Sequence, residues 1–219
     1  MQDVRYFGIG LGTSIWLLIG IFASIFGFQG MKGESYRIWN HFISELGDPR
    51  FAPHYRLFNF TLISGGLGLV PFILGWGLTF STILGKITIG IGLVVAILCA
   101  LIGVFPEHKE QIHFNVAGLF FIGMAVLIVL ISINMLRDPL SRFPIWFAGI
   151  NAVPCVVALV FIIDTMCLPK WEYLLTYRPW EWKPDRPRFW RNTILEWLSF
   201  LSMVGWLLLI TGYGIVQSL

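Results

Sequence analysis

The stretch that decides the fold runs from Ile83 to Phe105 and reads ILGKITIGIGLVVAILCALIGVF. It is continuously apolar apart from Lys86 and a few small polar or glycine positions, and it is long enough for a helix to cross roughly 30 Å of hydrocarbon. Its second half, from Leu93 to Phe105, is continuously apolar and does not alternate with a period of two, as it would in a strand of a membrane β-barrel. The stretch therefore predicts a membrane-spanning α-helix.

Similar apolar runs lie on both sides of this stretch. They cover residues 6–28, 58–79, 113–136, 143–167 and 193–216. With 57% apolar and 12% charged residues, the composition excludes an ordinary soluble globular protein. The loops are too short to bury cores of their own. We therefore predict an all-α, multi-pass integral membrane protein in which residues 1–219 form one domain, a bundle of six transmembrane helices.

Glycines are frequent within the predicted spans. Because lipid gives helices no hydrophobic reason to associate, small residues that let backbones approach closely commonly mark helix contacts. We expect this structural role, and not a nucleotide-binding loop, for Gly8, Gly10, Gly12, Gly65, Gly66, Gly68, Gly90 and Gly92.

The titratable side chains are unevenly divided between the two membrane faces. Six spans place all four histidines and ten of the twelve acidic residues in or near the loops of one face. The basic residues of this face outnumber those of the other, but its loops are also longer, so the positive-inside rule leaves the orientation open. Nucleic-acid binding is excluded, because a net charge of +3 is spread over loops that are also acidic. We therefore expect function at the membrane face that carries these histidines and acidic residues, which we call the titratable face.

The richest segment of that face, residues 36–49, predicts a short interfacial helix after the first span. His41, Ser44, Glu45 and Asp48 follow an i, i+3, i+4, i+7 pattern that places them on one helix face. Such a stripe fits an amphipathic helix whose polar side meets water and headgroups. It fits a polar binding site equally well, because a histidine, a hydroxyl and two carboxylates exceed what solvation requires.

A second segment joins the third and fourth spans and carries Glu107, His108, Glu110 and His113 on the same face. Two further carboxylates, Asp164 and Glu196, lie inside apolar runs, where each needs a partner or a polar cavity. Arg191, about one turn from Glu196, is one predicted partner; membership of the polar site is the alternative for Glu196.

Four short motifs together resemble a family of six-span proteins known as domain of unknown function 998. They are Ile-Ser-Glu-Leu-Gly after the first span, Phe-Asn opening the second, Gly-Val-Phe-Pro-Glu with a later histidine before the fourth, and Leu-Glu-Trp opening the last. The resemblance implies a six-helix membrane protein without an assigned reaction. The matching positions are Ser44, Glu45, Gly47, Asn59, Pro106, His113 and Glu196. A more distant likeness to the Frag1/DRAM/Sfk1 group implies a link to lipids.

The leading functional hypothesis is that the polar site binds or moves a membrane lipid or a small polar ligand. Arg37, Arg50 or Arg56 would then contact phosphate. The predicted ligand-binding residues are His41, Ser44, Glu45, Asp48, Asn59, Glu107, His113 and Glu196.

The alternative is a membrane-embedded lipid hydrolase or transferase, with or without a divalent metal. His41, His108, His113 and Asp48 are the residues that would hold such a metal. The chain resembles the alkaline-ceramidase and adiponectin-receptor-like hydrolases only superficially, because it lacks their late His-x-x-x-His pair. Haem ligation by two histidines is disfavoured, since only His113 lies at a span end. The sequence assigns no cofactor, catalytic residue or oligomeric state.

Overall fold

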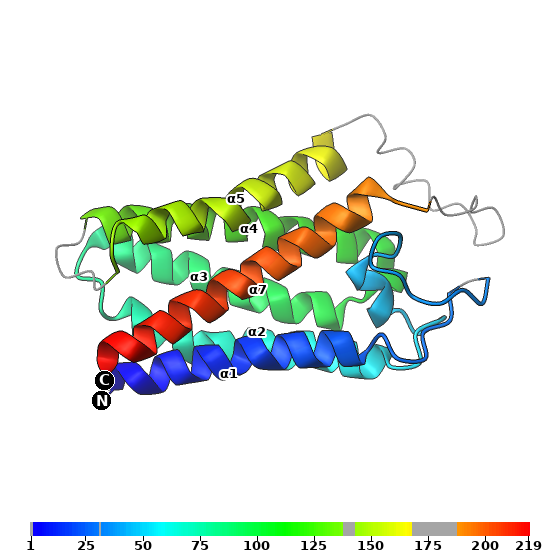
Figure 1. Cartoon of the computed structure of the whole chain (residues 1–219), viewed down its shortest axis with the longest axis horizontal. Helices are drawn as coiled ribbons and strands as arrows, with labels where there is room; N and C mark the ends of the chain where they lie inside the picture. Colours follow the sequence, from blue (N-terminus) through cyan, green and yellow to red (C-terminus); the bar gives the residue numbers. More distant parts are fainter. Residues whose placement is uncertain (1, 31, 138–142, 168–187) are drawn as a thin grey trace.

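The computed structural model describes residues 2–30, 32–137, 143–167 and 188–219. Within these ranges the chain forms six helices that are long and apolar enough to cross a membrane (Figure 1). Their bounds are α1 Gln2–Ala23, α2 Tyr55–Gly77, α3 Ile83–Val104, α4 Glu110–Arg137, α5 Trp146–Ile162 and α7 Arg191–Ser218. The predicted multi-pass, all-α architecture is confirmed.

Three short helical segments complete the described chain. Two are 3-10 helices, η1 (Ile43–Gly47) and η2 (Glu107–Lys109), and the third is a π-helical turn, η3 (Ile163–Cys167), that continues α5. The first span ends at Ala23 instead of residue 28 as predicted. The reason is a series of turns that leads to Gly27, whose φ of +68° lies in the left-handed region that glycine adopts without a Cβ clash.

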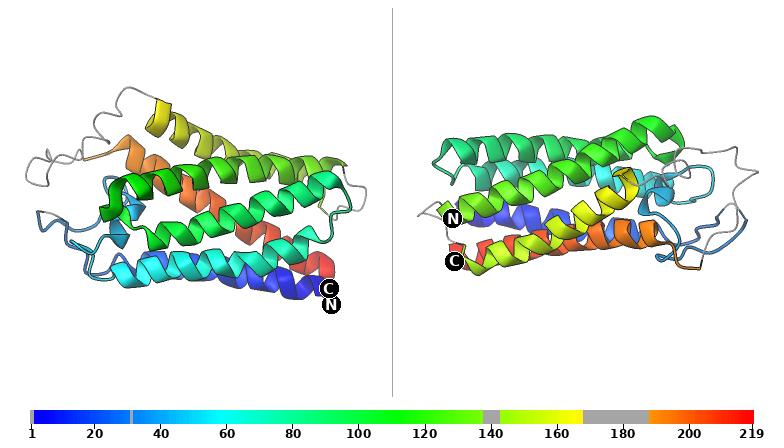
Figure 2. Two further views of the ribbon diagram at one scale, coloured as in Figure 1. Left: turned by 180° about the vertical axis from the view of Figure 1, so that it is seen from behind. Right: turned by 90° about the horizontal axis from the view of Figure 1, so that it is seen from above.

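The long helices form a closed ring in the order α1, α2, α3, α4, α5, α7, because each packs against the next and α7 returns to α1. Figures 1 and 2 show both termini at one end of the ring, while η1 and η2 lie at the other. The titratable residues singled out in the sequence therefore gather at the end opposite the termini.

Two apolar clusters fill the ring. One extends from the end that carries the termini as far as Phe121 and Phe161, and it contains an aromatic group formed by Phe7, Phe72, Trp76 and Phe143. The other joins α1, α2 and α7 to η1 through residues that include Leu46, which is completely buried. Burial of η1 in this second cluster positions the functional site.

Polar side chains within the membrane-spanning part are joined across helices. Trp206 Nε1 of α7 donates to Asn151 Oδ1 of α5 at 2.7 Å, and Asn151 Nδ2 donates to Ser132 Oγ of α4 at 2.9 Å. Separately, Asn134 Nδ2 donates to Thr88 Oγ1 at 2.8 Å and joins α4 to α3. These bonds satisfy polar groups that would otherwise be buried unpaired, and they contribute to holding the ring together.

Candidate functional site

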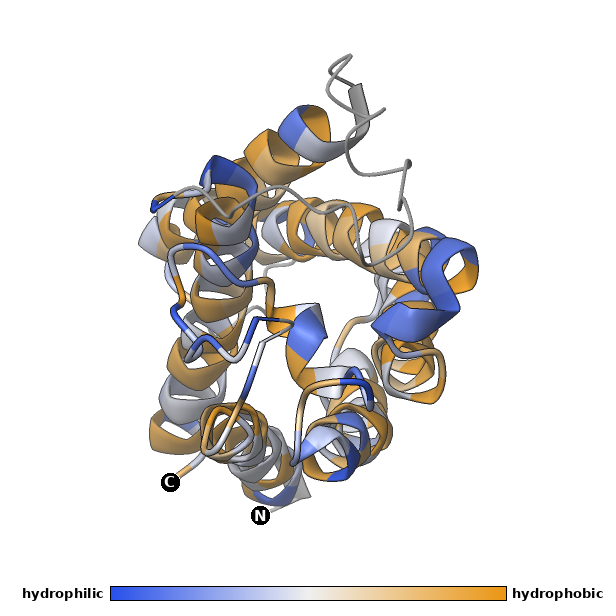
Figure 3. Cartoon of the chain, turned by 90° about the vertical axis from the view of Figure 1, so that its right-hand side faces the viewer, coloured by the Kyte–Doolittle hydropathy of each residue, from blue (hydrophilic) through white to orange (hydrophobic). Residues whose placement is uncertain are grey.

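A buried segment closes the end of the ring opposite the termini. We call it the plug and define it as residues 40–48; all of its residues are buried except Phe42 and Ser44, which are half-buried. Seen from this end, η1 lies in the middle of the ring of long helices (Figure 3). The plug therefore enters the bundle instead of lying on its surface.

A short helix follows the first span, as predicted, but it is not an amphipathic surface helix with one polar stripe. The helix spans only Ile43–Gly47, and the flanking residues Phe42 and Asp48 are extended, so the i, i+3, i+4, i+7 face does not form. His41, Glu45 and Asp48 expose 1%, 2% and 0% of their surface. Burial of Ile43 and Leu46 in the second apolar cluster carries these polar groups inward.

Two carboxylates hold the first turn of the plug. Phe42 N donates to Glu45 Oε1 at 3.0 Å, and Ile43 N donates to Glu196 Oε2 of α7 at 2.7 Å. The first backbone N–H groups of a helix have no acceptor within the helix, so these contacts satisfy donors that would otherwise be buried without a hydrogen bond. Glu196 thus connects the last helix to the plug.

Other plug residues also have structural partners. Asp48 accepts from the backbone N and the Nε of Arg50, each at 2.9 Å, and pairs with the Nη2 of the same arginine. Asn59 Nδ2 of α2 donates to Gly47 O at 3.1 Å. Asp48 therefore joins the plug to the residues just after it, and Asn59 joins the plug to α2.

His41 packs inside the aromatic surroundings of the plug. Its ring lies 5.0 Å from that of Tyr36 and 5.3 Å from that of Phe28, while Nε2 lies 3.7 Å from Glu34 Oε1. The Nδ1 atom lies 2.8 Å from Asn40 Oδ1. These contacts explain its burial without a ligand.

Tyr36 links the plug to α7 through Trp197. Trp197 Nε1 donates to Tyr36 Oη at 3.1 Å, and Tyr36 Oη donates to Phe42 O at 2.9 Å. Burial, followed by the nearby carboxylates of Glu45 and Glu196, raises the pKa of Tyr36 well above its ordinary value. The phenol consequently stays protonated and able to donate at physiological pH.

A cavity of about 100 Å³ lies beside the plug. Four parts of the chain surround it: the plug, the η2 and early α4 segment, the end of α5, and the start of α7. Its polar lining residues are Ser44, Glu107, Glu110, His113, Thr165 and Glu196; its apolar ones are Phe42, Phe114, Ala117, Gly118, Phe121, Phe161 and Ile162. The cavity is therefore amphipathic, with carboxylates as its charged groups.

His113 is oriented by the chain before α4. Its Nδ1 lies 2.7 Å from Phe105 O, and because a carbonyl oxygen only accepts, Nδ1 carries the hydrogen of this bond. The Nε2 atom is then the one available for other chemistry. Glu110, three residues before His113, also lines the cavity, and its φ of +24° is strained for a residue with a Cβ.

The two carboxylates predicted within apolar runs have different partners from those expected. Arg191 Nε donates to Asp164 Oδ2 at 3.1 Å, and the guanidinium also contacts Asp164 Oδ1. Arg191 therefore joins α7 to the end of α5. The predicted local pair between Glu196 and Arg191 is therefore not what the structure shows. Glu196 instead accepts a hydrogen bond from Ile43 N of the plug and lines the cavity.

The structure divides the predicted ligand-binding residues into two groups. Ser44, Glu107, His113 and Glu196 line one cavity, whereas His41, Glu45, Asp48 and Asn59 hold the plug in place. Sequence reasoning missed Thr165 and the phenylalanines of α4 and α5. Thr165 offered one signal, its place beside Asp164 near the end of an apolar run. In the described parts of the chain, no three histidine, cysteine or acidic side chains are grouped to hold a metal ion.

Comparison with known proteins gives one match. Residues 17–213 match a family model described as protein of unknown function, DUF998. No curated protein and no solved structure matches the chain. The distant likeness to the Frag1/DRAM/Sfk1 group stays a prediction.

Proposed function

The chain belongs to the DUF998 family of membrane proteins of unknown function, and we propose that its amphipathic cavity binds an amphiphile through a protonated amine head group. The observation that carries this proposal is the lining of the cavity. Carboxylates and apolar rings line the same space, which matches a ligand with a cationic end and an apolar body.

The charge of the cavity favours a cation over a phosphate. Glu107, Glu110 and Glu196 line it, and no lysine or arginine does so among the described residues. Arg50, one of the three arginines predicted to contact phosphate, is engaged by Asp48. An ammonium group that enters the cavity would be attracted by these acidic side chains.

The size and apolar wall of the cavity limit what enters. Phe114, Phe121 and Phe161 provide aromatic surface on which an apolar body or an ammonium group can rest. The volume of about 100 Å³ is below that of a cavity of roughly 150 Å³ that holds benzene. The cavity therefore suits a small head group and not a whole lipid.

A head-group comparison tests the proposal. The protein is reconstituted in phosphatidylcholine nanodiscs, and Kd values are measured for a sixteen-carbon amine and for the carboxylic acid of the same chain length, with empty nanodiscs correcting for partitioning. We expect the amine to bind at least about tenfold more tightly, equivalent to about 1.4 kcal/mol. Glu196→Gln, which keeps an acceptor for Ile43 N, is expected to weaken binding of the amine alone.

Substitutions on α4 and α5 control this experiment. Ala117→Phe fills the cavity and is expected to abolish amine binding, whereas Ala152→Phe, on the lipid-exposed side of α5, should leave it unchanged. Equal affinities for amine and acid, or tighter binding of the acid, would contradict the proposal.

A hydrolase remains the second function to test, because the Ser44 hydroxyl and the His113 imidazole line the same cavity. Its probe is an N-acyl amine with a sixteen-carbon acyl chain. Release of fatty acid that disappears in Ser44→Ala would support hydrolysis. Quantitative recovery of the intact probe by mass spectrometry would contradict it.

A further inference from the structure

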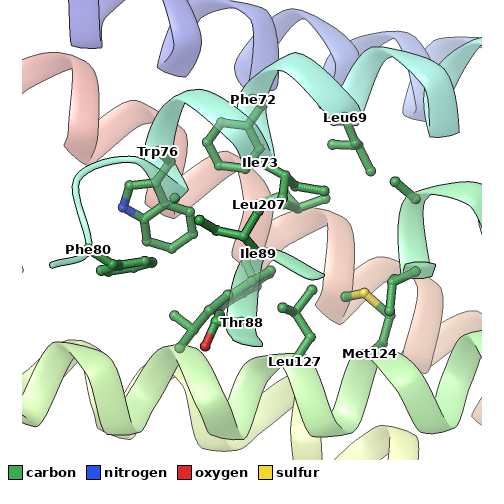
Figure 4. Close-up of a pocket in the computed structure, with 15 residues that line it drawn as sticks. Leu69, Phe72, Ile73, Trp76, Phe80, Thr88, Ile89, Met124, Leu127 and Leu207 are labelled. Atoms are coloured by element: carbon green, nitrogen blue, oxygen red, sulfur yellow. The ribbon is translucent and has the colours of Figure 1, made fainter. Parts of the chain in front are cut away.

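A second cavity lies deeper in the bundle and is almost entirely apolar. It measures about 40 Å³ and lies among α2, α3, α4 and α7. Figure 4 shows Leu69, Phe72 and Trp76 of α2 facing Met124 and Leu127 of α4 across this space. No charged side chain lines it among the described residues. A buried water needs two to four polar partners, so this cavity suits hydrocarbon better than water or ions.

One face of α4 lines both cavities. Residues that are three or four positions apart share a helix face, and the lining residues of α4 follow this spacing from one cavity into the other. In the amphipathic cavity they are Glu110, His113, Phe114, Ala117, Gly118 and Phe121; in the apolar cavity they are Met124, Leu127 and Ile131. The two cavities therefore follow one another along a single helix.

A pair of aromatic rings lies at the inner end of the amphipathic cavity. Phe121 of α4 and Phe161 of α5 have ring centroids 4.8 Å apart in an edge-to-face arrangement, and both are buried. Met124, which lines the apolar cavity, follows Phe121 by one helical turn. Because a phenylalanine ring can change rotamer without a backbone shift, Phe121 can act as a movable partition.

Resting on the proposed function, we infer that the apolar cavity receives the end of the hydrocarbon chain of the amphiphile whose head occupies the amphipathic cavity. Binding turns the Phe121 ring aside, and the hydrocarbon chain of the ligand then lies along the face of α4 that lines both cavities. The small volume of the apolar cavity admits a chain end and not a second head group.

The separation of the two cavities sets the chain length. Met124, where the apolar cavity begins on α4, follows His113 by eleven residues, which at about 1.5 Å per residue is about 16 Å of helix. One leaflet contributes about half of the roughly 30 Å hydrocarbon thickness. A chain must therefore be at least as long as an ordinary membrane acyl chain to reach from one cavity to the other.

A chain-length series tests this inference in the full-length protein in phosphatidylcholine nanodiscs. Kd values are measured for six-carbon and sixteen-carbon amines, each corrected for partitioning with empty nanodiscs. We expect the long amine to bind at least about tenfold more tightly. Leu127→Phe, which fills the apolar cavity, should remove this advantage, while Val126→Phe, on the exposed side of the same helix, should retain it.

Two further variants make the result decisive. Phe121→Ala removes the partition and also one ring from the wall of the amphipathic cavity, so the ratio of long-amine to short-amine affinity is expected to rise even if both amines bind less tightly. If Leu127→Phe also loses the short amine, its fold is damaged, and Ile89→Phe on α3 then fills the same cavity from another helix.

Equal corrected affinities for both amines, unchanged by cavity filling, would overturn the inference but leave the head-group proposal standing. Failure of both amines to bind would overturn the proposed function itself.

Discussion

Replacing Gly66 with alanine is expected to lower the free energy of unfolding by about 1–3 kcal/mol, the usual effect of overpacking a close contact. A Cβ at this position would lie 2.5 Å from the carbonyl oxygen of Ala96 and 2.6 Å from the backbone nitrogen of Ala100. Both atoms belong to the backbone of α3 and cannot turn away as a side chain can. The helices α2 and α3 must therefore separate, which weakens the packing along their length.

The matched control for this substitution is Gly90→Ala. Gly90 lies on α3, and a Cβ there would meet nothing within 4 Å. Alanine favours a helix over glycine by up to about 1 kcal/mol, so the control should be neutral or slightly stabilising. Titration with a denaturing detergent measures both variants in mixed micelles. Equal stability of the two variants would show that α2 and α3 do not approach as closely as described.

Replacing Glu196 with alanine is expected to release the plug and to lower the free energy of unfolding by about 1–3 kcal/mol, the cost of a stranded buried donor. The substitution removes the acceptor that lies 2.7 Å from Ile43 N. Glu196→Gln keeps an acceptor oxygen for Ile43 N, so its effect should be much smaller. Comparison of these two variants isolates the contribution of the hydrogen bond.

Release of the plug can be measured directly at Ser44, which is half-buried. In a Ser44→Cys background, maleimide labelling should be faster with Glu196→Ala than with Glu196→Gln. Leu198→Ala, on the exposed side of the same helix, controls for general loosening of α7. Equal labelling rates, or an equal loss of stability for alanine and glutamine, would contradict the role assigned to Glu196.

The six spans were predictable because the signal that defines them is local. Each apolar run must form a helix in lipid to satisfy its own backbone hydrogen bonds, whatever the rest of the chain does. The structure confirms all six spans, with end positions shifted by a few residues. The titratable face was predictable for the same reason, because successive spans place successive loops on opposite sides of the membrane. Glycine contacts were only partly predictable: Gly66 meets backbone, whereas Gly8, Gly12 and Gly90 face open space.

The site itself depends on contacts between distant parts of the sequence. Residues 36–49 have the periodicity of a surface helix, and contacts with distant helices, such as the bond from Ile43 N to Glu196, 153 positions away, make the segment a plug. Likewise, Arg191 is close in sequence to Glu196 but pairs with Asp164 on the neighbouring helix. The local sequence pattern predicted that these residues lie at one membrane face, but it could not predict which of them pair with each other.

The connection between the plug and α7 also has a consequence for biosynthesis. Glu196 leaves the ribosome 153 residues after Ile43, a delay of roughly 8–30 s at about 5–20 residues per second. Throughout that interval, in which α2 to α5 are made, the nascent chain lacks the acceptor for Ile43 N, and it also lacks Trp197. Closure of the ring and seating of the plug are therefore late, post-insertion events, and the assembling chain exposes a polar opening until its last helix arrives.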